Sequence, residues 1–490
     1  MNAEAALPWI KRIGVALIVA VALVHLGFRI QLIPDHRTDI GGAELNVVYG
    51  VQKILLGRSL YEDPELPPFD VMQYTPAYYG VCVAAAMVLN IDPHDSYALF
   101  LLSRIISLIV NLVTCLWIFR LCKTLEIDAW LSVAVAAIAF TLFTEHFYSR
   151  GDSMYALLFT GTLVVFVRWL KHGVNAKALV IVALLAVLCL LCKQTGILLI
   201  GIIGAHLLLA KQWRAFFTFS GATILFLATF LLLIFKNTPP EIFYKNTVLG
   251  IANGMTRTMY IELFDPPTYK YYIGWHIAGA LLVVAFLRSR DALDRFLAIA
   301  IGCAFAFGFI TGLKNGSNIN YLFEAHLLVV VGIARWCVRA TRWQVQCAGL
   351  FLLYGLLFTV HRTRVLHKRV GTEEYRALME AAYRADLHTH DVLWNELGLR
   401  AEDKVFITYR GHLELLLNGQ GLLAQKDILE WSVKPLFNYD GTTTRLADGT
   451  VRFVITDAPV DTLRFQGHSY PLFQQVREVD GRHILAPSAR

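Results

Sequence analysis

The stretch FYSRGDSMYALLF, Phe147 to Phe159, places an arginine and an aspartate two residues apart in the middle of an apolar chain. The chain has 490 residues, of which 56% are hydrophobic and only 17% are charged, and its mean hydropathy is +0.53. Globular proteins carry about 25% charged residues. The composition therefore predicts an all-α protein that crosses a membrane many times. Within such a protein, the charged side chains of Arg150 and Asp152 require polar surroundings.

Apolar stretches long enough to span a bilayer recur over the first 360 residues and predict about eleven transmembrane helices. These stretches lie near 13–33, 97–119, 129–144, 154–170, 178–192, 195–210, 214–235, 272–287, 293–313, 321–338 and 346–361. We expect the first one to remain as a signal anchor, because it lacks a small-residue cleavage site. A shorter apolar piece, 78–91, is bounded by Pro76 and Pro93 and is interpreted as a juxtamembrane or re-entrant helix.

The distribution of basic residues orients these helices. If 78–91 does not span, most Lys and Arg fall in loops on the side of the N-terminus, and the short loops opposite hold only Arg150, Lys193 and Lys314. Cytoplasmic loops carry the excess of Lys and Arg. The net charge of +7 thus reflects topology rather than nucleic-acid binding. We expect a membrane protein with a cytoplasmic N-terminus and a C-terminal domain on the outer face.

Two domains are expected from this pattern. Residues 1–362 form the transmembrane module, with a long first outer loop at 34–96 that contains juxtamembrane helices. Residues 363–490 form a small extracytoplasmic α/β domain, in which TEEYRALMEAAYRADLHTHDVLWNELG has helical spacing, KVFITY and RFVITD are typical strands, and GHLELLLNG is a short helix.

Two carboxylates follow the first apolar stretch. Asp39 and Glu44 begin a segment that becomes amphipathic, and a helix lying along the interface would hold a carboxylate at headgroup depth. Partly removed from water, such a group can act as a general base. The alternative is that Asp39 caps the helix and Glu44 faces water.

Four cations and one buried carboxylate complete the candidate site. Arg104, Arg150, Lys193 and Lys314 fall on the outer face, where they suit a phosphate or pyrophosphate group arriving from the lipid. Each of them alone is also explained by snorkelling. Glu324 lies inside an apolar stretch, which marks a functional site by default, and the alternative is a salt bridge to a neighbouring helix.

Several kinds of chemistry lack a motif here. The chain has no Walker loop, Rossmann fingerprint, Gly-x-Ser-x-Gly or His-Glu-x-x-His sequence, so nucleotide chemistry and ATP-driven transport are unsupported. Asp39, Glu145 and Asp152 are the residues that could share a divalent metal ion. We assign no metal ligand, and a divalent ion is the one cofactor that stays open.

Together these motifs resemble the bacterial GT-C glycosyltransferases, in particular those allied to protein O-mannosyltransferases and to the lipid A aminoarabinose transferase. The similarity covers the layout of residues 10–360. It is carried by the acidic residue after the first span and by the motifs LLGRSLYEDPELPPFDVMQYTPAYYG, FYSRGDSMYALLF, CKQTGILLIG and GSNINYLFE. The chain lacks the adjacent Asp-Glu pair of the mannosyltransferases, because Ile40 follows Asp39, and its C-terminal region does not resemble their β-trefoil. Both departures argue against a protein acceptor.

The resemblance implies a GT-C fold and a hexosyl- or pentosyltransferase that moves a sugar from a polyprenyl-phosphate donor to a glycolipid, polysaccharide or protein acceptor on the outer face, with inversion. It implies Asp39 as the base, with Glu44 as second choice. The residues assigned to substrate binding are Tyr74, Arg104, Arg150, Asp152, Lys193, Gln194, Asn320, Tyr321 and Glu324. The expected partners are the lipid-linked donor, the bilayer and the acceptor, and no nucleic acid.

Two other classes of protein remain alternatives. A secondary transporter or flippase for a lipid-linked or anionic solute would place polar residues near the bilayer midplane, usually in two similar halves, whereas here they gather at one face. A non-catalytic assembly subunit would use the C-terminal domain to recruit a partner.

Overall fold

A computed structural model provides the structure of the chain. It describes residues 3–37, 43–66, 68–146, 148–173, 175–252, 254–314, 317, 319–338, 342–409, 411–425, 445–460, 463–465, 468–470 and 472–488. Asp39 lies outside these ranges.

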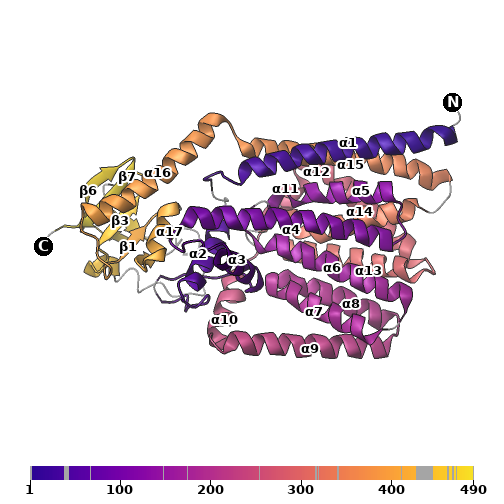
Figure 1. Ribbon diagram of the computed structural model, residues 1–490, viewed down its shortest axis with the longest axis horizontal. Coiled ribbons are helices and arrows are strands. Elements are labelled where there is room, and N and C mark those ends of the chain that lie inside the picture. The colour runs from indigo at the N-terminus through magenta and orange to yellow at the C-terminus, as the bar shows by residue number, and fades with distance from the viewer. Residues whose placement is uncertain are drawn as a thin grey trace.

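Each apolar stretch predicted as a membrane helix forms a helix, and these helices lie side by side in one bundle (Figure 1). They are α1 (Ala3–Leu32), α4 (Ser96–Thr124), α5 (Ala129–Leu142), α6 (Gly151–His172), α7 (Ala176–Cys192), α8 (Ile197–Leu209), α9 (Trp213–Phe235), α12 (Pro266–Leu287), α13 (Ala292–Gly312), α14 (Phe323–Cys337) and α15 (Arg342–Val370). Polar caps define several of their starts: the side chains of Asp95, Asp128, Asn175 and Asp291 accept hydrogen bonds from backbone N–H groups of the following turn.

Seven segments of the described chain are long and apolar enough to cross a membrane. They are Lys11–Leu32, Ser96–Thr124, Gly151–His172, Trp213–Phe235, Thr268–Leu287, Ala292–Gly312 and Ile319–Cys337. The helices α5, α7 and α8 are apolar but shorter. The chain is therefore a multi-pass membrane protein, and the count of eleven spans stays a prediction.

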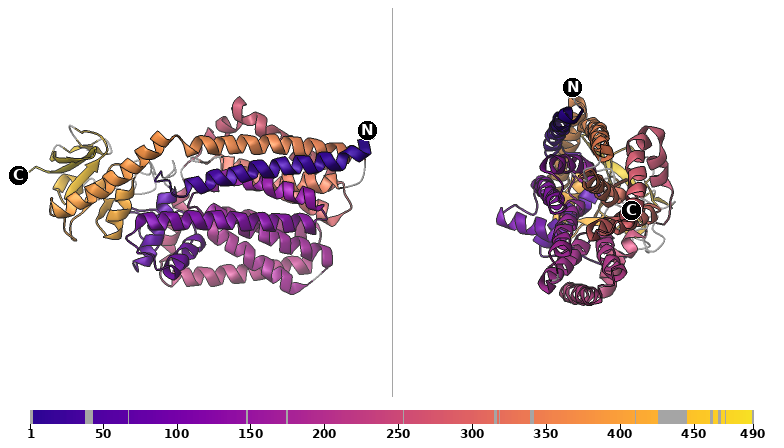
Figure 2. Two further views of the ribbon diagram at one scale, coloured as in Figure 1. Left: turned by 45° about the horizontal axis from the view of Figure 1, so that its top comes forward. Right: turned by 90° about the vertical axis from the view of Figure 1, so that its right-hand side faces the viewer.

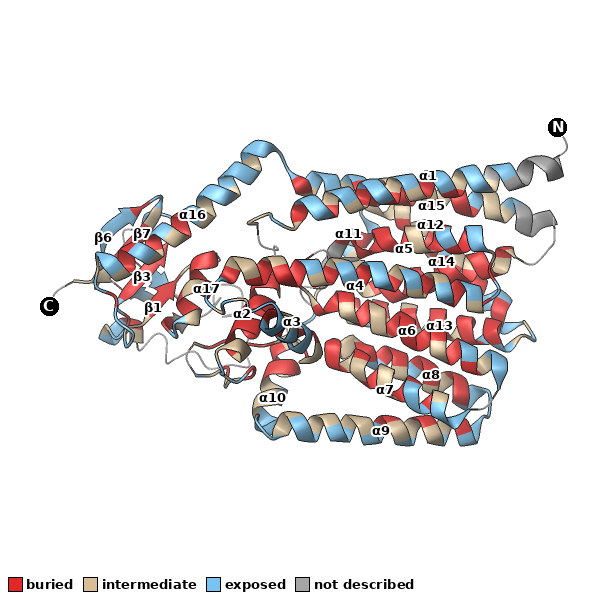
Figure 3. Cartoon of the chain, in the orientation of Figure 1, coloured by how far each residue is buried: buried red, intermediate tan, exposed pale blue. Residues whose placement is uncertain are grey.

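Burial divides the bundle into inner and outer helices (Figure 3). In the apolar windows, 72% of the residues of the segment that contains α14 and 61% of those of α6 are buried, against 11% for α9. Since α9 exposes large apolar side chains such as Phe217, Ile224 and Leu232, its outer face suits contact with lipid tails. The helices α6 and α14 begin in the interior of the molecule, where their first turns carry candidate site residues.

Short helices gather at one end of the bundle. They are α2 (Ala43–Leu55), α3 (Ala77–Val88), α10 (Pro240–Thr247) and α11 (Thr258–Phe264), with the 3₁₀ helices η1 (Phe143–His146), η2 (Gln194–Gly196), η3 (Leu249–Ile251) and η4 (Ile319–Leu322). The apolar piece predicted at 78–91 is α3. Its end exposes Met87, Val88 and Leu89, as expected for a helix that lies in the membrane interface.

The C-terminal unit, residues 373–488, stands beyond that end of the bundle and is reached by α16 (Figure 2). It contains α16 (Glu373–Asn395), α17 (His412–Gly419) and the strands β1 (Val405–Ile407), β2 (Leu423–Gln425), β3 (Phe453–Thr456), β4 (Leu463–Phe465), β5 (His468–Tyr470), β6 (Phe473–Val479) and β7 (Arg482–Pro487). Five strands form one sheet in the order β2-β1-β3-β7-β6, and β4 pairs with β5. The strand β1 is parallel to β2 and β3, and the pairs β3/β7 and β6/β7 are antiparallel.

This region is an α/β unit, as the sequence predicts. The division of the chain at residue 362 stays a proposal, and the helix α15 continues past that residue to Val370. The N-terminus and the C-terminal unit lie at opposite ends of the molecule (Figure 1).

Candidate active site

Glu44 and Arg104 form a buried ion pair next to the start of the first loop. Glu44 lies in the first turn of α2, and its carboxylate accepts hydrogen bonds from Arg104 Nε at 2.7 Å and Arg104 Nη2 at 2.8 Å. Ser149 adds its backbone N–H at 3.1 Å and its hydroxyl at 3.2 Å. Both oxygens of the carboxylate face a guanidinium, which is the strong bidentate form of this interaction.

The same guanidinium also holds the end of α1. Arg104 Nη1 donates to the backbone carbonyls of Leu32 and Ile33, each at 3.1 Å, and to that of Asp35, and Nη2 donates to the carbonyl of Arg37 at 2.7 Å. Arg104 thus connects the residues before 38–42 with Glu44 after them. The N–H groups of Arg104 donate to groups of the protein itself, which favours a positioning role for Arg104 over the predicted contact with substrate. The carboxylate of Glu44 is likewise bound by protein groups, those of Arg104 and Ser149.

Asp152 and Lys193 form a second buried pair, 2.5 Å apart between Lys193 Nζ and Asp152 Oδ1. Asp152 lies in the first turn of α6, and Lys193 directly follows the last residue of α7, so each charge lies at the helix end that the macrodipole favours. Gly151 makes the approach of these two helix ends possible, because a Cβ there would lie 2.8 Å from the carbonyl oxygen of Cys192.

Aromatic rings surround this second pair. Lys193 Nζ lies 5.2 Å from the ring centroid of Tyr321 and 5.9 Å from that of Tyr155, which are distances of cation–π contacts. The charge of Glu324 acts on the Tyr155 hydroxyl, and the charge of Lys193 acts on the Glu324 carboxylate. Glu324 therefore lies beside the Asp152–Lys193 pair, in the first turn of α14.

Tyr74 reaches the same place from the first loop. Burial raises the pKa of Tyr74 to about 12, and the charges of Arg150, Asp152 and Lys193 all act on its hydroxyl. Thr75 next to it donates to the carbonyl of Leu190 at 3.0 Å, which fixes this part of the loop on the end of α7.

Gln194 and Asn320 belong to the surroundings of the cluster. Gln194 Nε2 donates to the carbonyls of Gln73, at 2.5 Å, and Thr247, at 3.0 Å, and so ties the first loop to α10. Within the described chain, the Oδ1 atom of Asn320 is buried without a hydrogen bond. Gln194 is engaged by backbone groups, whereas the amide oxygen of Asn320 has unused capacity.

Tyr148 joins the two buried pairs into one site. Its ring lies 5.9 Å from the guanidinium carbon of Arg104 and 5.9 Å from that of Arg150. Ser149, the next residue, donates to Glu44, and Arg150 precedes α6. The stretch at 148–152 therefore runs from one ion pair to the other, which explains why Arg150 and Asp152 stand together in an apolar chain.

The structure thus brings most of the predicted residues together, and adds Tyr148, Ser149 and Tyr155, which sequence reasoning missed. Tyr155 follows Asp152 by one helical turn, so its position on the same helix face was a usable signal. Asp39 lies outside the described residues, and its role as base stays a prediction. In the parts of the chain that the structure describes, no group of three His, Cys, Asp or Glu residues could hold a metal ion.

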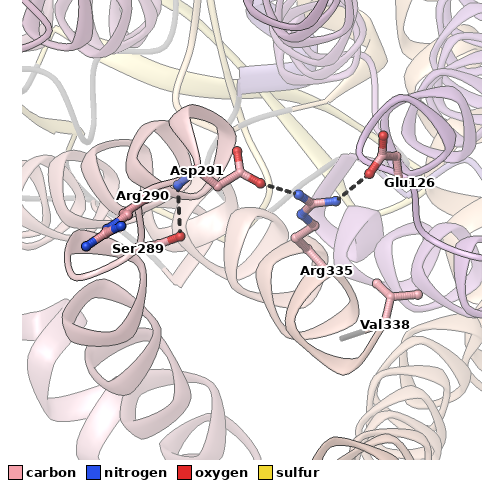
Figure 4. Close-up of a pocket in the computed structure, with 6 residues that line it drawn as sticks. All are labelled: Glu126, Ser289, Arg290, Asp291, Arg335 and Val338. Atoms are coloured by element: carbon pink, nitrogen blue, oxygen red, sulfur yellow. Dashed lines mark hydrogen bonds and ion pairs between the residues drawn. The ribbon is translucent and has the colours of Figure 1, made fainter. Parts of the chain in front are cut away.

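A pocket of about 490 Å³ lies at the opposite end of the bundle and is shown in Figure 4. Arg335 of α14 pairs there with Asp291 at 2.6 Å and with Glu126 and Asp294, each at 3.4 Å. Arg335 faces the acids of this pocket (Figure 4), and none of the residues assigned to substrate binding lines it. We interpret this cluster as a set of salt bridges that connects the ends of neighbouring helices.

Comparison with known proteins rests on structure. No family model matches the chain, and no curated protein matches it in sequence. The structure is similar to that of ArnT from Cupriavidus metallidurans bound to undecaprenyl phosphate, with a TM-score of 0.62 and 13% identity over 96% of this chain and 97% of that chain.

Two archaeal structures are also similar. The Archaeoglobus fulgidus oligosaccharyltransferase in complex with Zn and sulfate has a TM-score of 0.55 and 13% identity, over 90% of this chain and 68% of that chain. AglB from the same organism, in complex with an inhibitory peptide and a dolichol-phosphate, has a TM-score of 0.55 and 13% identity, over 91% and 69%.

These neighbours are glycosyltransferases with the GT-C fold, and the chain described here has that fold. The predicted fold class is confirmed. Among the neighbours reported above, ArnT is the one matched over nearly its whole length, including the region that corresponds to the C-terminal unit.

Proposed function

We propose that the chain is a glycosyltransferase that moves a sugar from a polyprenyl-phosphate donor to an acceptor hydroxyl on the extracytoplasmic side of a bacterial inner membrane. The proposal rests on one observation: the chain has a GT-C fold, and a buried cluster of cations, carboxylates and tyrosines lies at one end of its helix bundle. ArnT was solved with undecaprenyl phosphate and AglB with dolichol-phosphate, so both support a lipid-phosphate donor.

The reaction is a direct displacement at the anomeric carbon. The acceptor oxygen forms a bond to that carbon, the bond from the carbon to the phosphate oxygen breaks, and its electron pair stays on the phosphate. The acceptor proton passes to a carboxylate, which is Asp39 in this proposal. One displacement inverts the anomeric centre.

The cations at and beside the Asp152–Lys193 pair are suited to bind the phosphate of the donor. Arg150 and Lys193 supply positive charge where negative charge develops on the departing phosphate, and Tyr74 and Tyr321 offer hydroxyl groups beside them. Asp152 holds the Lys193 ammonium in place: burial alone would lower the pKa of Lys193, but Asp152 keeps it above its usual value. Asp152 then orients the phosphate through Lys193, and Glu324 orients the sugar.

The remaining residues support this arrangement. Arg104 and Glu44 hold the loop on both sides of 38–42, and Gln194 fixes the wall formed by residues 73–75. The acceptor is a glycolipid, a polysaccharide or a protein, and the two departures from the mannosyltransferases favour the first two.

A divalent ion is an open part of the proposal, since one neighbour was solved with Zn. Of the three residues predicted to share such an ion, Asp152 is already paired with Lys193. A metal here would have to compete with an ammonium at 2.5 Å. We therefore derive no step through a metal, and a chelator is expected to leave the activity unchanged.

The test is transfer of labelled sugar from a panel of polyprenyl-phosphate sugars by the purified protein in lipid, with Arg150→Ala and the control Arg335→Gln at the opposite end of the bundle. Activity lost in Arg150→Ala and retained in Arg335→Gln is the expected result. If the wild type uses none of the donors but carries them between the leaflets of a vesicle, the chain is a flippase. If it neither uses nor binds them, it is an assembly subunit.

A further inference from the structure

The C-terminal unit shares a hydrophobic core with the first loop. Val47 and Val51 of α2, Leu413 and Leu417 of α17, and Ile455 of β3 belong to one continuous cluster of buried side chains. The same cluster includes residues of α3 and α4, and α17 lies beside α2 and α4 in the molecule (Figure 1). Separating the unit from the loop would expose this core to water.

Polar contacts fix the position of α17 on α2. Asn418 Nδ2 donates to Gln52 Oε1 at 2.6 Å, and Gln52 Nε2 donates to the carbonyl of Pro93 at 2.9 Å. Arg58 Nη1 donates to Asn418 Oδ1 at 3.1 Å. The side chains of Gln52 and Asn418 are buried. Because buried amides lose stability when a partner is removed, these bonds define one relative position of the two helices.

The unit also holds the residues that precede 38–42. The imidazole of His36 packs against the rings of Tyr97 of α4 and Tyr383 of α16, with ring centroids 4.5 and 4.4 Å away. His412 Nε2 of α17 donates to the carbonyl of His36 at 3.3 Å. Two helices of the C-terminal unit therefore contact a single residue of the first loop.

The neighbouring residue is held from the same side. Arg37 Nη2 donates to the carbonyl of Arg369 near the end of α15, and the guanidinium lies 5.2 Å from the ring centroid of Tyr375 on α16. The C-terminal part of the chain thus contacts the first loop at two places. One is residues 36–37, and the other is α2.

We propose that the C-terminal unit is a positioning element for the reaction, in which Tyr383 and α17 hold the first loop at His36 and at α2. The inference rests on the proposed function for the identity of the reaction. The unit acts as a fixed part of the catalytic body rather than as a lid, and its residues position the first loop without touching the substrate.

The first test uses a conservative pair of variants. Tyr383→Ala removes the ring that stacks on His36, and Tyr383→Phe keeps it. We expect kcat to fall about 10- to 100-fold in Tyr383→Ala, the cost of a displaced catalytic group, with the KM for the acceptor and the melting temperature nearly unchanged. Tyr383→Phe is expected to behave as the wild type.

The second test introduces a larger side chain into the interface between α17 and α2. A Cβ on Gly419 would lie 2.9 Å from Gln52 Nε2 and 3.0 Å from His94 Nδ1, so Gly419→Leu pushes α17 away from α2. Gly419 is the last residue of α17, where a leucine suits a helix. Ala447→Leu places the same side chain at an exposed position of the unit and is the control. We expect kcat to fall in the first variant and not in the second.

Hydrogen–deuterium exchange separates this inference from the proposed function. In lipid, the amides of residues 33–37 and of α2 are expected to exchange faster in Tyr383→Ala and Gly419→Leu than in the wild type and the two controls. If no donor is ever used, the transferase proposal fails and exchange alone decides whether the unit holds the loop. Unchanged exchange overturns the inference. So does faster exchange at unchanged kcat, or a raised KM for the acceptor at unchanged kcat, which would make the unit an acceptor-binding domain.

Discussion

Arg104 connects several parts of the candidate site through a single side chain. It donates to the carboxylate of Glu44 and to four backbone carbonyls before the segment 38–42. A lysine has three donors on a single nitrogen and cannot reproduce this planar pattern. The position therefore requires arginine for its geometry as well as for its charge.

A charge exchange tests this role. Arg104→Glu combined with Glu44→Arg restores opposite charges, but a glutamate at 104 has no donor for the carbonyls of Leu32, Ile33 and Arg37. We expect the double variant to remain inactive and to lose about 3 to 5 kcal/mol of stability, as when a buried pair is broken. Transfer activity and thermal melts in lipid check this.

The matched control is Arg384→Glu with Glu380→Arg, an exposed pair on α16 whose exchange is expected to change little. Recovery of activity in the exchanged 44/104 variant would show that charge alone matters at that position and would contradict the positioning role.

His412 adds a pH dependence at the interface of α17. Burial lowers the pKa of His412 to about 3, well below its ordinary value of 6.5. Below pH 6.5 the unfolded chain binds a proton at His412 that the folded chain excludes. The contribution of neutral His412 to the free energy of unfolding is therefore present above about pH 6.5 and is lost as the pH falls toward 3. The slope for one such group is about 1.4 kcal/mol per pH unit.

The prediction is that the wild type loses more stability between pH 7 and pH 5 than His412→Gln, which cannot titrate. Thermal melts in lipid at both pH values measure the difference, and Ala447→Leu, which retains His412, should follow the wild type. Equal losses in the wild type and His412→Gln would mean that His412 is protonated in the fold.

At the scale of helices, much of the fold follows from the sequence. Each apolar run predicted as a span forms a helix, because such a run satisfies its backbone hydrogen bonds internally. The helix α16 and the strands β1 and β3 also appear where period and composition predict them. Short helices such as η4 and α11 were not predicted, because they are too brief to show a period.

Pairings between distant helices could not be predicted in the same way. The sequence indicates that Glu44 and Arg104 face the same side, but not that they bind each other, because 60 positions separate them. Lys193 and Asp152 meet because Gly151 lets two helix ends approach, and a glycine in a sequence does not reveal which backbone it faces. The alternative interpretation of Glu44 as a water-facing residue is wrong, since its side chain is buried.

The cluster at the opposite end of the bundle makes a prediction at this scale. Arg335 connects the turn between α4 and α5 with the turn between α12 and α13 through Glu126, Asp291 and the buried Asp294. Arg335→Gln is expected to lower stability by about 3 kcal/mol while kcat stays the same, because these contacts are remote from the candidate site.

The paired measurements are a thermal melt and a transfer assay below the melting temperature. Asp294→Asn, which keeps the shape of the side chain, should act in the same direction. A fall in kcat without a fall in stability would show that this end takes part in the reaction.

For the whole molecule, the residues of the candidate site are gathered at the end that carries the C-terminal unit, while outer helices of the bundle such as α9 expose large apolar side chains. This arrangement suits a donor whose lipid tail stays in the bilayer and whose phosphate and sugar enter at the surface. The similarity to ArnT extends over 96% of this chain and 97% of that chain, so the shared fold includes the bundle and the C-terminal unit together.

The most direct test is the transfer of labelled sugar from polyprenyl-phosphate donors by wild type and Asp39→Asn in lipid. We predict transfer by the wild type, with inversion at the anomeric carbon. In the variant we predict a loss of about 100-fold or more, in the range of general-base effects, at an unchanged melting temperature and unchanged donor binding. Full activity of Asp39→Asn would contradict the assignment of the base, and absence of transfer by the wild type with every donor would contradict the function.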